Sequence, residues 1–377
     1  MRLREPVIIE ALRTPVGKNG GAFKDIRPDD LAIVVLQALL ERSGIEPGLI
    51  EDVIIGCVTQ KGEQGGNLAR LITLAAGLPV SVAATSVNRL CGSGQQAVTF
   101  AAQEIATGLA EVVLAGGVES MSRELMASDL GPLNPKLTER YEIVVQGESA
   151  ERIAERWEIS RRELDQFSLE SHRKAAQAAD EGRFAAELVP VPVAGELIRQ
   201  DETIRRNTSL EKMATLAPAF RPAGVITAGN SSQISDGAAL LLLTSREKAQ
   251  ELGLKPKAHF LSWAVIGVDP TIMLTGPIPA TQLALKRAGL QLGDLDIFEV
   301  NEAFASVPLA WGRELDADWE KLNVNGGAIA LGHPLGCSGA RLMTTALHEL
   351  ERREAERALI TMCIGFGQGI ATIIERE

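Results

Sequence analysis

The chain carries at positions 86–97 the sequence Ser86-Val87-Asn88-Arg89-Leu90-Cys91-Gly92-Ser93-Gly94-Gln95-Gln96-Ala97. A β-prone run leads into Cys91, and a helical pattern follows from Gln95 to Thr107, which predicts a strand, a tight turn bearing a thiol, and a helix. A helix N-terminus has unpaired N–H groups and a partial positive charge, which favour a thiolate. Gly92 and Gly94 leave room for a carbonyl group beside the backbone amides. The stretch therefore predicts an activated nucleophile with an oxyanion hole.

Two other interpretations apply to the same residues. A lone cysteine in an apolar context is usually a small buried hydrophobe. Residues 92–97 also match G-x-G-x-x-A, the dinucleotide-binding fingerprint. That fingerprint requires an acidic residue at the end of the next strand, whereas Glu111 precedes the strand expected over 112–115. A nicotinamide oxidoreductase is therefore the poorer fit.

Composition limits the classes of protein that fit. At 377 residues the chain is long for one core, so two or three domains are expected. Hydrophobic residues make up 45% and aromatic residues only 4%, so aliphatic side chains must fill the core. The net charge of −11 argues against non-specific nucleic-acid binding, which needs a basic face. We find no signal peptide and no apolar run long enough to span a membrane, so a cytoplasmic protein is expected.

The cysteine pattern predicts free thiols and no metal site. The four cysteines, none in a C-x-x-C pair, are Cys57, Cys91, Cys337 and Cys363. His333 lies four residues before Cys337, but a proline and a glycine between them disrupt a helical ligand pair. We interpret Cys57 and Cys337 as structural.

Strand and helix patterns alternate at both ends of the chain. Strands are expected at 7–9, 53–58, 82–90, 112–115, 259–268, 297–300 and 358–364, and helices at 31–43, 67–76, 95–107, 280–288 and 339–351. Asp29 or Asp30 is the expected N-cap of the helix at 31–43, and Gly44 closes it. Such alternation predicts an α/β fold with a mainly parallel sheet covered on both faces.

The middle of the chain differs. Polar helices are expected at 148–155 and 161–179, followed by a basic cluster formed by Arg205, Arg206, Lys212 and Arg221. We therefore expect an inserted, partly helical loop domain at 121–237. It would lie between an N-terminal α/β half, residues 1–120 completed by about 238–250, and a C-terminal half, residues 251–377.

The two α/β regions resemble each other at a fixed offset. Gly44 matches Gly289 and Ser93 matches Ser338, and the separations agree, since 289 − 44 = 245 and 338 − 93 = 245. One offset that holds at two separate places indicates a duplicated domain. A junction of duplicated sheets is a favoured place for a site.

Three further motifs carry candidate reactive groups. His333 lies in a glycine–proline turn at the duplicate of the Cys91 junction, as a catalytic base or a hydrogen-bonded core histidine. Cys363 ends a strand before a glycine-rich turn, as a functional thiol or a core cysteine. Asn301 follows a strand, where an asparagine caps a helix or holds a water or a carbonyl.

Taken together, these motifs resemble the thiolase family, the acyl-CoA C-acyltransferases, over nearly the whole chain. The residues that carry the resemblance are N-R-L-C-G-S-G at 88–94, G-G-V-E-S-M-S at 116–122, G-N-S-S at 229–232, S-D-G-A at 235–238, N-E-A-F at 301–304, G-H-P-L-G-C-S-G at 332–339 and C-I-G at 363–365. The resemblance implies a duplicated five-layered αβαβα fold with an inserted loop domain, in a homodimer or homotetramer.

The resemblance also implies a role for each matching residue. Cys91 is the implied nucleophile that accepts an acyl group, and His333 the base that activates it. Cys363 is the implied acid or base at the α-carbon of acetyl-CoA. Asn301 is expected to hold a water that, with His333, forms one oxyanion hole. The backbone amides of Cys91 and Gly365 form the other.

Coenzyme A follows from the resemblance as a substrate. Arg205 and Ser232 match positions that contact it, no cofactor is bound permanently, and no metal is required. The basic cluster of the loop domain would then meet the phosphates of an acyl-CoA.

Departures from the family pattern bear on the acyl group. Phe366 and Gln368 stand where many members have glycines, and Val145-Gln146-Gly147 replaces a common His-Met-Gly. We therefore favour degradative cleavage of a longer or bulkier 3-oxoacyl-CoA, as in β-oxidation of fatty acids, over a biosynthetic acetyl-CoA acetyltransferase. A decarboxylating ketoacyl synthase and a catalytically silent lipid-carrier or scaffold homologue are the remaining alternatives.

Overall fold

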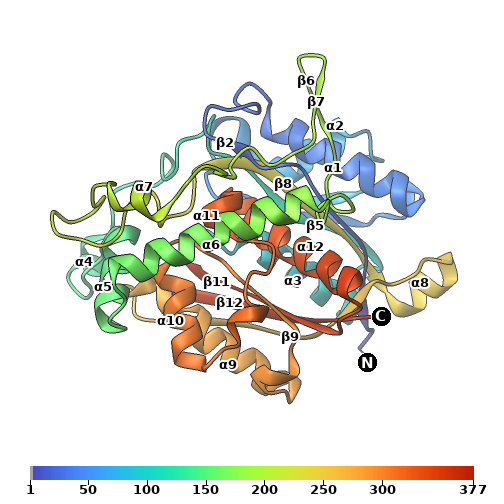
Figure 1. The fold of residues 1–377 in the computed structure, drawn as a ribbon. Coiled ribbons are helices and arrows are strands. Elements are labelled where there is room, and N and C mark those ends of the chain that lie inside the picture. Colours follow the sequence, from blue (N-terminus) through green and yellow to red (C-terminus); the bar gives the residue numbers. More distant parts are fainter. Residues whose placement is uncertain (1–2) are drawn as a thin grey trace.

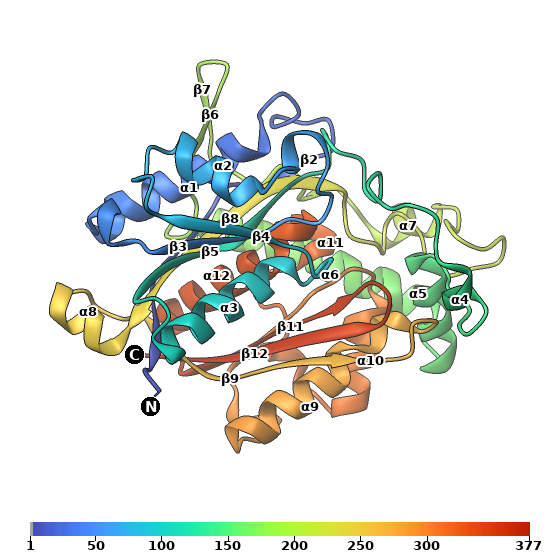
Figure 2. The ribbon, with the colours of Figure 1, turned by 180° about the vertical axis from the view of Figure 1, so that it is seen from behind.

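The computed structural model describes residues 3–377 and has five layers of helix and sheet (Figure 1 and Figure 2). One outer layer contains α1 (Pro28–Ser43) and α2 (Leu68–Ala75), and the other contains α9 (Pro277–Ala288) and α10 (Ser306–Leu315). The helices α3 (Ser93–Thr107) and α12 (Leu335–Arg353) lie between the two halves of the sheet.

The sheet joins an N-terminal and a C-terminal set of strands. Its order is β10-β11-β12-β9-β1-β8-β5-β3-β4, with the short β2 paired to β8. The strands are β1 (Pro6–Arg13), β2 (Gly17–Lys18), β3 (Asp52–Gly56), β4 (Ala83–Val87), β5 (Val112–Ser120), β8 (Ser235–Ser245), β9 (Ala258–Gly267), β10 (Ile297–Val300), β11 (Arg357–Ile364) and β12 (Gln368–Arg376). The two sets meet where Val7 pairs with His259 and Ile8 with Ala258.

The expectation of a mainly parallel sheet is wrong. Only β3–β4, β3–β5 and β10–β11 pair in parallel among the strands of residues 3–377. β8 returns antiparallel beside β5, and β12 returns antiparallel beside β11 after a tight hairpin. The run Leu240–Leu243 of β8 is completely buried because helices cover both faces of the strand.

The repeat at an offset of 245 residues is confirmed. The strand β3 begins at Asp52 and β10 at Ile297, and 297 − 52 = 245. The helices α1 and α9 end before Gly44 and Gly289, which both adopt the left-handed conformation. Two copies of one α/β unit therefore pack against each other.

The central helices meet at equivalent glycines. A β-carbon on Gly94 would lie 2.5 Å from the carbonyl oxygen of Gly336, and one on Gly339 would lie 2.5 Å from the backbone nitrogen of Gln95. Side chains at either glycine would push α3 and α12 apart. Their absence brings the turn at Cys91 next to the loop that precedes α12.

Most of the remaining elements belong to the segment of sequence that follows β5 and precedes β8. They are α4 (Pro135–Thr138), α5 (Gln146–Arg156), α6 (Arg161–Asp180), β6 (Val191–Val193), β7 (Glu196–Ile198) and α7 (Leu210–Ala214), with α8 (Arg246–Leu252) and α11 (Ala328–Leu331) elsewhere. Five short 3₁₀ turns are η1 (Pro47–Leu49), η2 (Gly62–Gln64), η3 (Met273–Thr275), η4 (Leu292–Asp294) and η5 (Trp319–Lys321). The domain boundaries at 1–120, 121–237 and 251–377 stay predictions.

Two expected element boundaries are wrong. The helix α1 begins at Pro28 with Arg27 as its N-cap, so Asp29 and Asp30 lie in the first turn rather than at the cap. The strand β5 continues through its two glycines to Ser120, because β8 pairs with it along its whole length. In the part of the chain described, no helix is both long enough and apolar enough to cross a membrane.

Candidate active site

Cys91 lies at the turn between β4 and α3, and its side chain is almost completely buried. Ser93 fixes the turn, since its hydroxyl accepts from the Arg89 N–H (2.9 Å) and donates to the Leu90 carbonyl (2.6 Å). Leu90 has a φ of +47°, a conformation that a non-glycine residue adopts only when its surroundings hold it there. The thiol is therefore held on a rigid, strained turn.

The backbone N–H groups at the start of α3 favour the thiolate of Cys91, as expected, but burial outweighs them. Burial raises the pKa of the Cys91 thiol to about 11, and the N–H groups of Gly365 and Cys91 lower it only in part. The buried carboxylate of Glu119 adds to the rise. Cys91 is thus a neutral thiol in the free protein, so a nucleophilic role would require a base.

His333 is a buried imidazole whose tautomer is fixed by its neighbours. The hydroxyl of Ser338 donates to the Pro334 carbonyl (2.8 Å), so it accepts a hydrogen bond from the Nδ1–H of His333. The lone pair then lies on Nε2, which is 3.4 Å from the amide nitrogen of Asn301. Burial, followed by the charge of Arg341, lowers the pKa of His333 to about 3, so the imidazole is neutral.

Asn301 is fully buried and directs its side chain at His333 rather than at a helix. The next helix, α10, begins only at Ser306, so the capping interpretation of Asn301 is wrong. Its carbonyl oxygen Oδ1 has no hydrogen-bond partner among the described residues. A buried amide oxygen without a partner is suited to hold a water.

Glu302 connects this site to the inserted segment. Its carboxylate accepts from the Ser171 hydroxyl of α6 (2.7 Å), the Asn323 amide (2.8 Å) and the Ile329 N–H (3.1 Å). Since Ile329 lies in α11, just before the loop that carries His333, these bonds fix that loop against α6.

Cys363 is the second-last residue of β11 (Arg357–Ile364) and is also buried. Burial raises the pKa of its thiol well above the usual range, and a thiolate at the nearby Cys91 would raise it further. The hairpin after β11 turns through Phe366, whose φ is +58°, and directs the Gly365 N–H at the sulfur of Cys91. Two thiols and an oriented amide thus meet at one place.

A cavity of about 730 Å³ opens onto this place. Its lining contains Val58, Asn88, Leu90, Cys91, Met126, Ala127, Asp129, Leu130, Leu133, Ile143, Val144, Val145, Gln146, Gly147, Phe220, Met273, Phe304, Leu335, Gly365 and Phe366. The walls are mostly aliphatic and aromatic, so the cavity suits an apolar group linked to the atom that Cys91 attacks.

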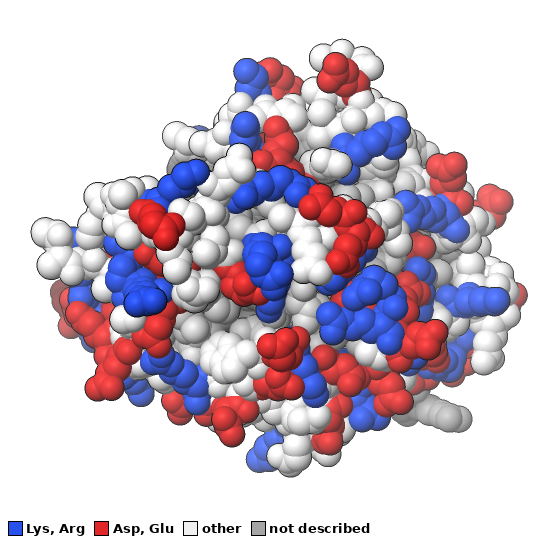
Figure 3. Space-filling model, viewed as in Figure 1, with Lys and Arg blue, Asp and Glu red and all other residues white. Residues whose placement is uncertain are grey.

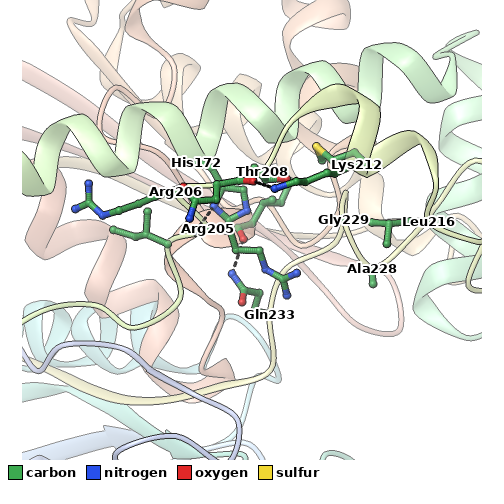
Figure 4. Close-up of a pocket in the computed structure, with 13 residues that line it drawn as sticks. His172, Arg205, Arg206, Thr208, Lys212, Leu216, Ala228, Gly229 and Gln233 are labelled. Carbon is green, nitrogen blue, oxygen red and sulfur yellow. Dashed lines mark hydrogen bonds between the residues drawn. The ribbon is translucent and has the colours of Figure 1, made fainter.

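A second cavity, of about 520 Å³, lies below α6 and α7 and has basic walls (Figure 4). Arg205, Arg206 and Lys212 line it, and the Arg205 N–H donates to Nδ1 of His172 (3.1 Å). Over the face that contains α6 and α7, basic and acidic side chains are otherwise interspersed (Figure 3). The cavity gathers positive charge on a chain that is acidic as a whole.

The structure separates two predicted residues from this basic cavity. Arg221 is paired with Glu148 and Glu155 of α5, so its expected membership of the basic cluster is wrong. Ser232 is not among the described residues that line either cavity, and its N–H donates to the Ala303 carbonyl (3.0 Å).

Sequence reasoning missed two supporting residues. Ser338 sets the tautomer of His333, and the signal was present in its match to Ser93 at the offset of 245. Glu119 accepts hydrogen bonds from the N–H groups of Val58, Thr59 and Gly336. These bonds connect β5 to the chain that follows β3 and to the first turn of α12. A charged residue in a strand that is otherwise apolar was the available signal for Glu119.

The site and fold agree with comparisons to known proteins. The family model for the thiolase N-terminal domain matches residues 6–247, and that for the thiolase C-terminal domain matches residues 254–376. The chain therefore belongs to the thiolase family and has its duplicated, five-layered α/β fold.

Relatives and a solved structure match over the full length. A 3-ketoacyl-CoA thiolase of Bacillus subtilis is 46% identical over 99% of this chain and 100% of its own. A 3-oxoadipyl-CoA/3-oxo-5,6-dehydrosuberyl-CoA thiolase of Escherichia coli is 46% identical, with the same coverage. The crystal structure of the Bacillus anthracis acetyl-CoA acetyltransferase has a TM-score of 0.92, with 41% identity and complete coverage of both chains.

Proposed function

We propose that this chain is an acyltransferase that cleaves a 3-oxoacyl-CoA with coenzyme A, giving acetyl-CoA and a shortened acyl-CoA. The observation that carries the proposal is the convergence of Cys91, Cys363 and the Gly365 N–H beside an apolar cavity whose lining includes Cys91 and Gly365. The family and the names of the relatives support the same reaction.

In the first half-reaction the sulfur of Cys91 attacks the 3-oxo carbon while Nε2 of His333 takes the thiol proton. Since Cys91 and His333 are both neutral in the free protein, the proton moves as the sulfur attacks, and no free thiolate has to accumulate. The amides of Cys91 and Gly365 stabilise the oxyanion, and each such donor contributes roughly 10²–10³ in rate. The Ser338 oxygen stabilises the imidazolium through Nδ1–H.

Cleavage of the C2–C3 bond then leaves the acyl group on Cys91 and releases the enolate of acetyl-CoA. A water on Asn301 and the protonated His333 stabilise the enolate oxygen, and Cys363 protonates its α-carbon. Coenzyme A next attacks the Cys91 thioester while its thiol proton passes to the Cys363 thiolate, and the Cys91 sulfur leaves by taking back the proton held on His333. This transfer of the shortened acyl group to coenzyme A predicts ping-pong kinetics.

The basic cavity supports the binding of coenzyme A as a substrate rather than as a permanent cofactor. Arg205 and Lys212 supply positive charge for its phosphates, and Arg206 lines the same cavity while it pairs with Asp180 (2.9 Å). Ser232 stays a prediction from the sequence, as do the absence of a metal, the cytoplasmic location and the homodimeric or homotetrameric assembly. Light scattering after gel filtration measures that assembly.

The volume of the acyl cavity supports degradation of longer 3-oxoacyl chains over synthesis of acetoacetyl-CoA. In that synthesis Cys91 carries an acetyl group, which would place only a methyl group in the cavity. The thiol at Cys363 supports thiolytic cleavage over a decarboxylating ketoacyl synthase, whose intermediate needs no proton removed from an α-carbon.

The test separates acyl transfer from carbon–carbon chemistry. Wild-type protein should cleave 3-oxooctanoyl-CoA with coenzyme A, and octanoyl-CoA should leave an octanoyl adduct on Cys91 in mass spectra. Cys91→Ala should lose both. Cys363→Ala should keep the adduct and lose cleavage. Cleavage by Cys91→Ala, or loss of the adduct in a folded Cys363→Ala, would contradict the assigned roles.

A further inference from the structure

We propose that the acyl cavity selects 3-oxoacyl chains with an apolar end and rejects chains that end in a carboxylate. The inference rests on the proposed thiolytic function and names the substrate class of the same site. Sequence identity does not decide the question, because two relatives at 46% identity carry names for a 3-ketoacyl-CoA and for a 3-oxoadipyl-CoA.

The lining of the cavity contains no lysine, arginine or histidine among the residues described. A carboxylate that enters the cavity loses hydration and meets apolar side chains without a cation to pair with, which is strongly unfavourable. The one ionisable side chain besides Cys91 is Asp129, whose negative charge repels a carboxylate. The charge of the wall therefore opposes a dicarboxylic acyl chain.

The polar groups of the lining are already engaged or lie at the reacting end. The amide of Asn88 donates to the Val58 carbonyl (2.8 Å) and accepts from the Leu90 N–H (2.8 Å). A β-carbon placed on Gly365 would lie 3.4 Å from Nε2 of Gln146, so this amide lies beside the catalytic hairpin. Neither amide carries a positive charge that could neutralise a carboxylate at the far end of an acyl chain.

Two cations close to the lining residues in sequence are neutralised, and Arg89, between the lining residues Asn88 and Leu90, donates to the Gln368 amide (2.9 Å) and is not itself part of the lining. Arg152 of α5 pairs with Glu142 and Glu148, and Arg221, which follows the lining residue Phe220, pairs with Glu148 and Glu155. Each guanidinium carries one positive charge and pairs with two carboxylates, which neutralise it. They offer no free positive charge to a bound carboxylate.

Aromatic residues complete an apolar wall. Phe220 and Phe304 pack edge to face with their centroids 5.9 Å apart, and Phe366 projects from the hairpin tip. Methylene groups that lie against this wall lose contact with water, which is worth about fourfold in kcat/KM for each one.

The test compares two six-carbon substrates that differ only at the far end, 3-oxohexanoyl-CoA and 3-oxoadipyl-CoA. We expect kcat/KM for thiolysis to favour 3-oxohexanoyl-CoA by on the order of 100-fold or more, and to rise again with 3-oxooctanoyl-CoA. Equal or faster cleavage of 3-oxoadipyl-CoA would overturn the inference while leaving the thiolytic function intact. Cleavage of no 3-oxoacyl-CoA would instead refute the proposed function.

A matched pair of variants tests the cause. Met126 lines the cavity and is 49% exposed, whereas its neighbour Leu125 is 73% exposed and is not part of the lining. Met126→Arg should raise the ratio of 3-oxoadipyl to 3-oxohexanoyl cleavage by about tenfold or more, and Leu125→Arg should leave it unchanged. The inference fails if the two arginines change the ratio equally or not at all.

Discussion

Replacement of Ser338 by alanine tests how His333 is prepared as a base. The serine hydroxyl donates to the Pro334 carbonyl at 2.8 Å, so its remaining role toward His333 is that of an acceptor for Nδ1–H. Ser338→Ala removes that acceptor from a site with no exposure to water. The imidazole then loses the contact that keeps the lone pair on Nε2 and stabilises the imidazolium.

The expected magnitude follows from the charge state. A hydrogen bond to a charged group contributes about 1.5–3 kcal/mol, and tenfold in rate corresponds to about 1.4 kcal/mol. Because the proposed mechanism charges His333 only when it takes the Cys91 proton, the loss should fall on kcat, by about 10- to 150-fold. KM should change little, since Ser338 lies in neither cavity lining among the described residues.

The assay is steady-state thiolysis of a 3-oxoacyl-CoA, and the control is Thr344→Ala. The Thr344 hydroxyl also donates to a carbonyl four residues earlier in α12 (2.9 Å) and is also buried, but it has no hydrogen bond to His333. Thr344→Ala should keep kcat within about twofold of wild type. A Ser338→Ala variant as active as this control would refute the role assigned to the hydroxyl.

Three other predictions follow from the structure. Alkylation of Cys91 by iodoacetamide, followed by peptide mass spectrometry, should accelerate about tenfold per pH unit from pH 7 to 10, because its pKa is about 11; a plateau below pH 8 would contradict this. Gly339→Ala should lower the free energy of unfolding by about 1–3 kcal/mol in urea titrations, whereas Gly293→Ala, which has no atom within 4 Å of an added β-carbon, should not. Burial raises the pKa of Glu299 to about 8, so the native state keeps a proton that the unfolded chain releases from about pH 4.5 upward. The free energy of unfolding of wild type should therefore fall relative to that of Glu299→Gln between about pH 4.5 and 8. The same pH dependence of the unfolding free energy in both proteins would argue against the raised pKa.

The local parts of the fold could be predicted from the sequence. The turn at Cys91 was recognisable because its glycines and the flanking patterns lie within a dozen residues. The spacing of 245 identified the duplication, since equivalent turns keep their glycines. The direction of β8 was not predictable, because this strand returns to the sheet only after the long inserted segment and pairs with a strand more than a hundred residues earlier.

The reactive groups were easier to find than their electrostatics. Cys91, His333, Asn301 and Cys363 stand in recognisable motifs, and the structure places the first and last side by side. The neutral state of Cys91 was missed because the sequence reveals a helix N-terminus but not the depth at which it is buried. The role of Ser338 was missed because it depends on which way its hydroxyl points.

The distribution of the reactive groups over the two repeats has a practical consequence. Cys91 belongs to the first repeat, while His333 and Cys363 belong to the second, so each repeat alone has an incomplete set. A chain cut between α8 and β9 would therefore give two inactive polypeptides whose reunion switches on catalysis. The rate at which such a split enzyme cleaves a 3-oxoacyl-CoA would then measure the fraction of the two halves that have docked correctly.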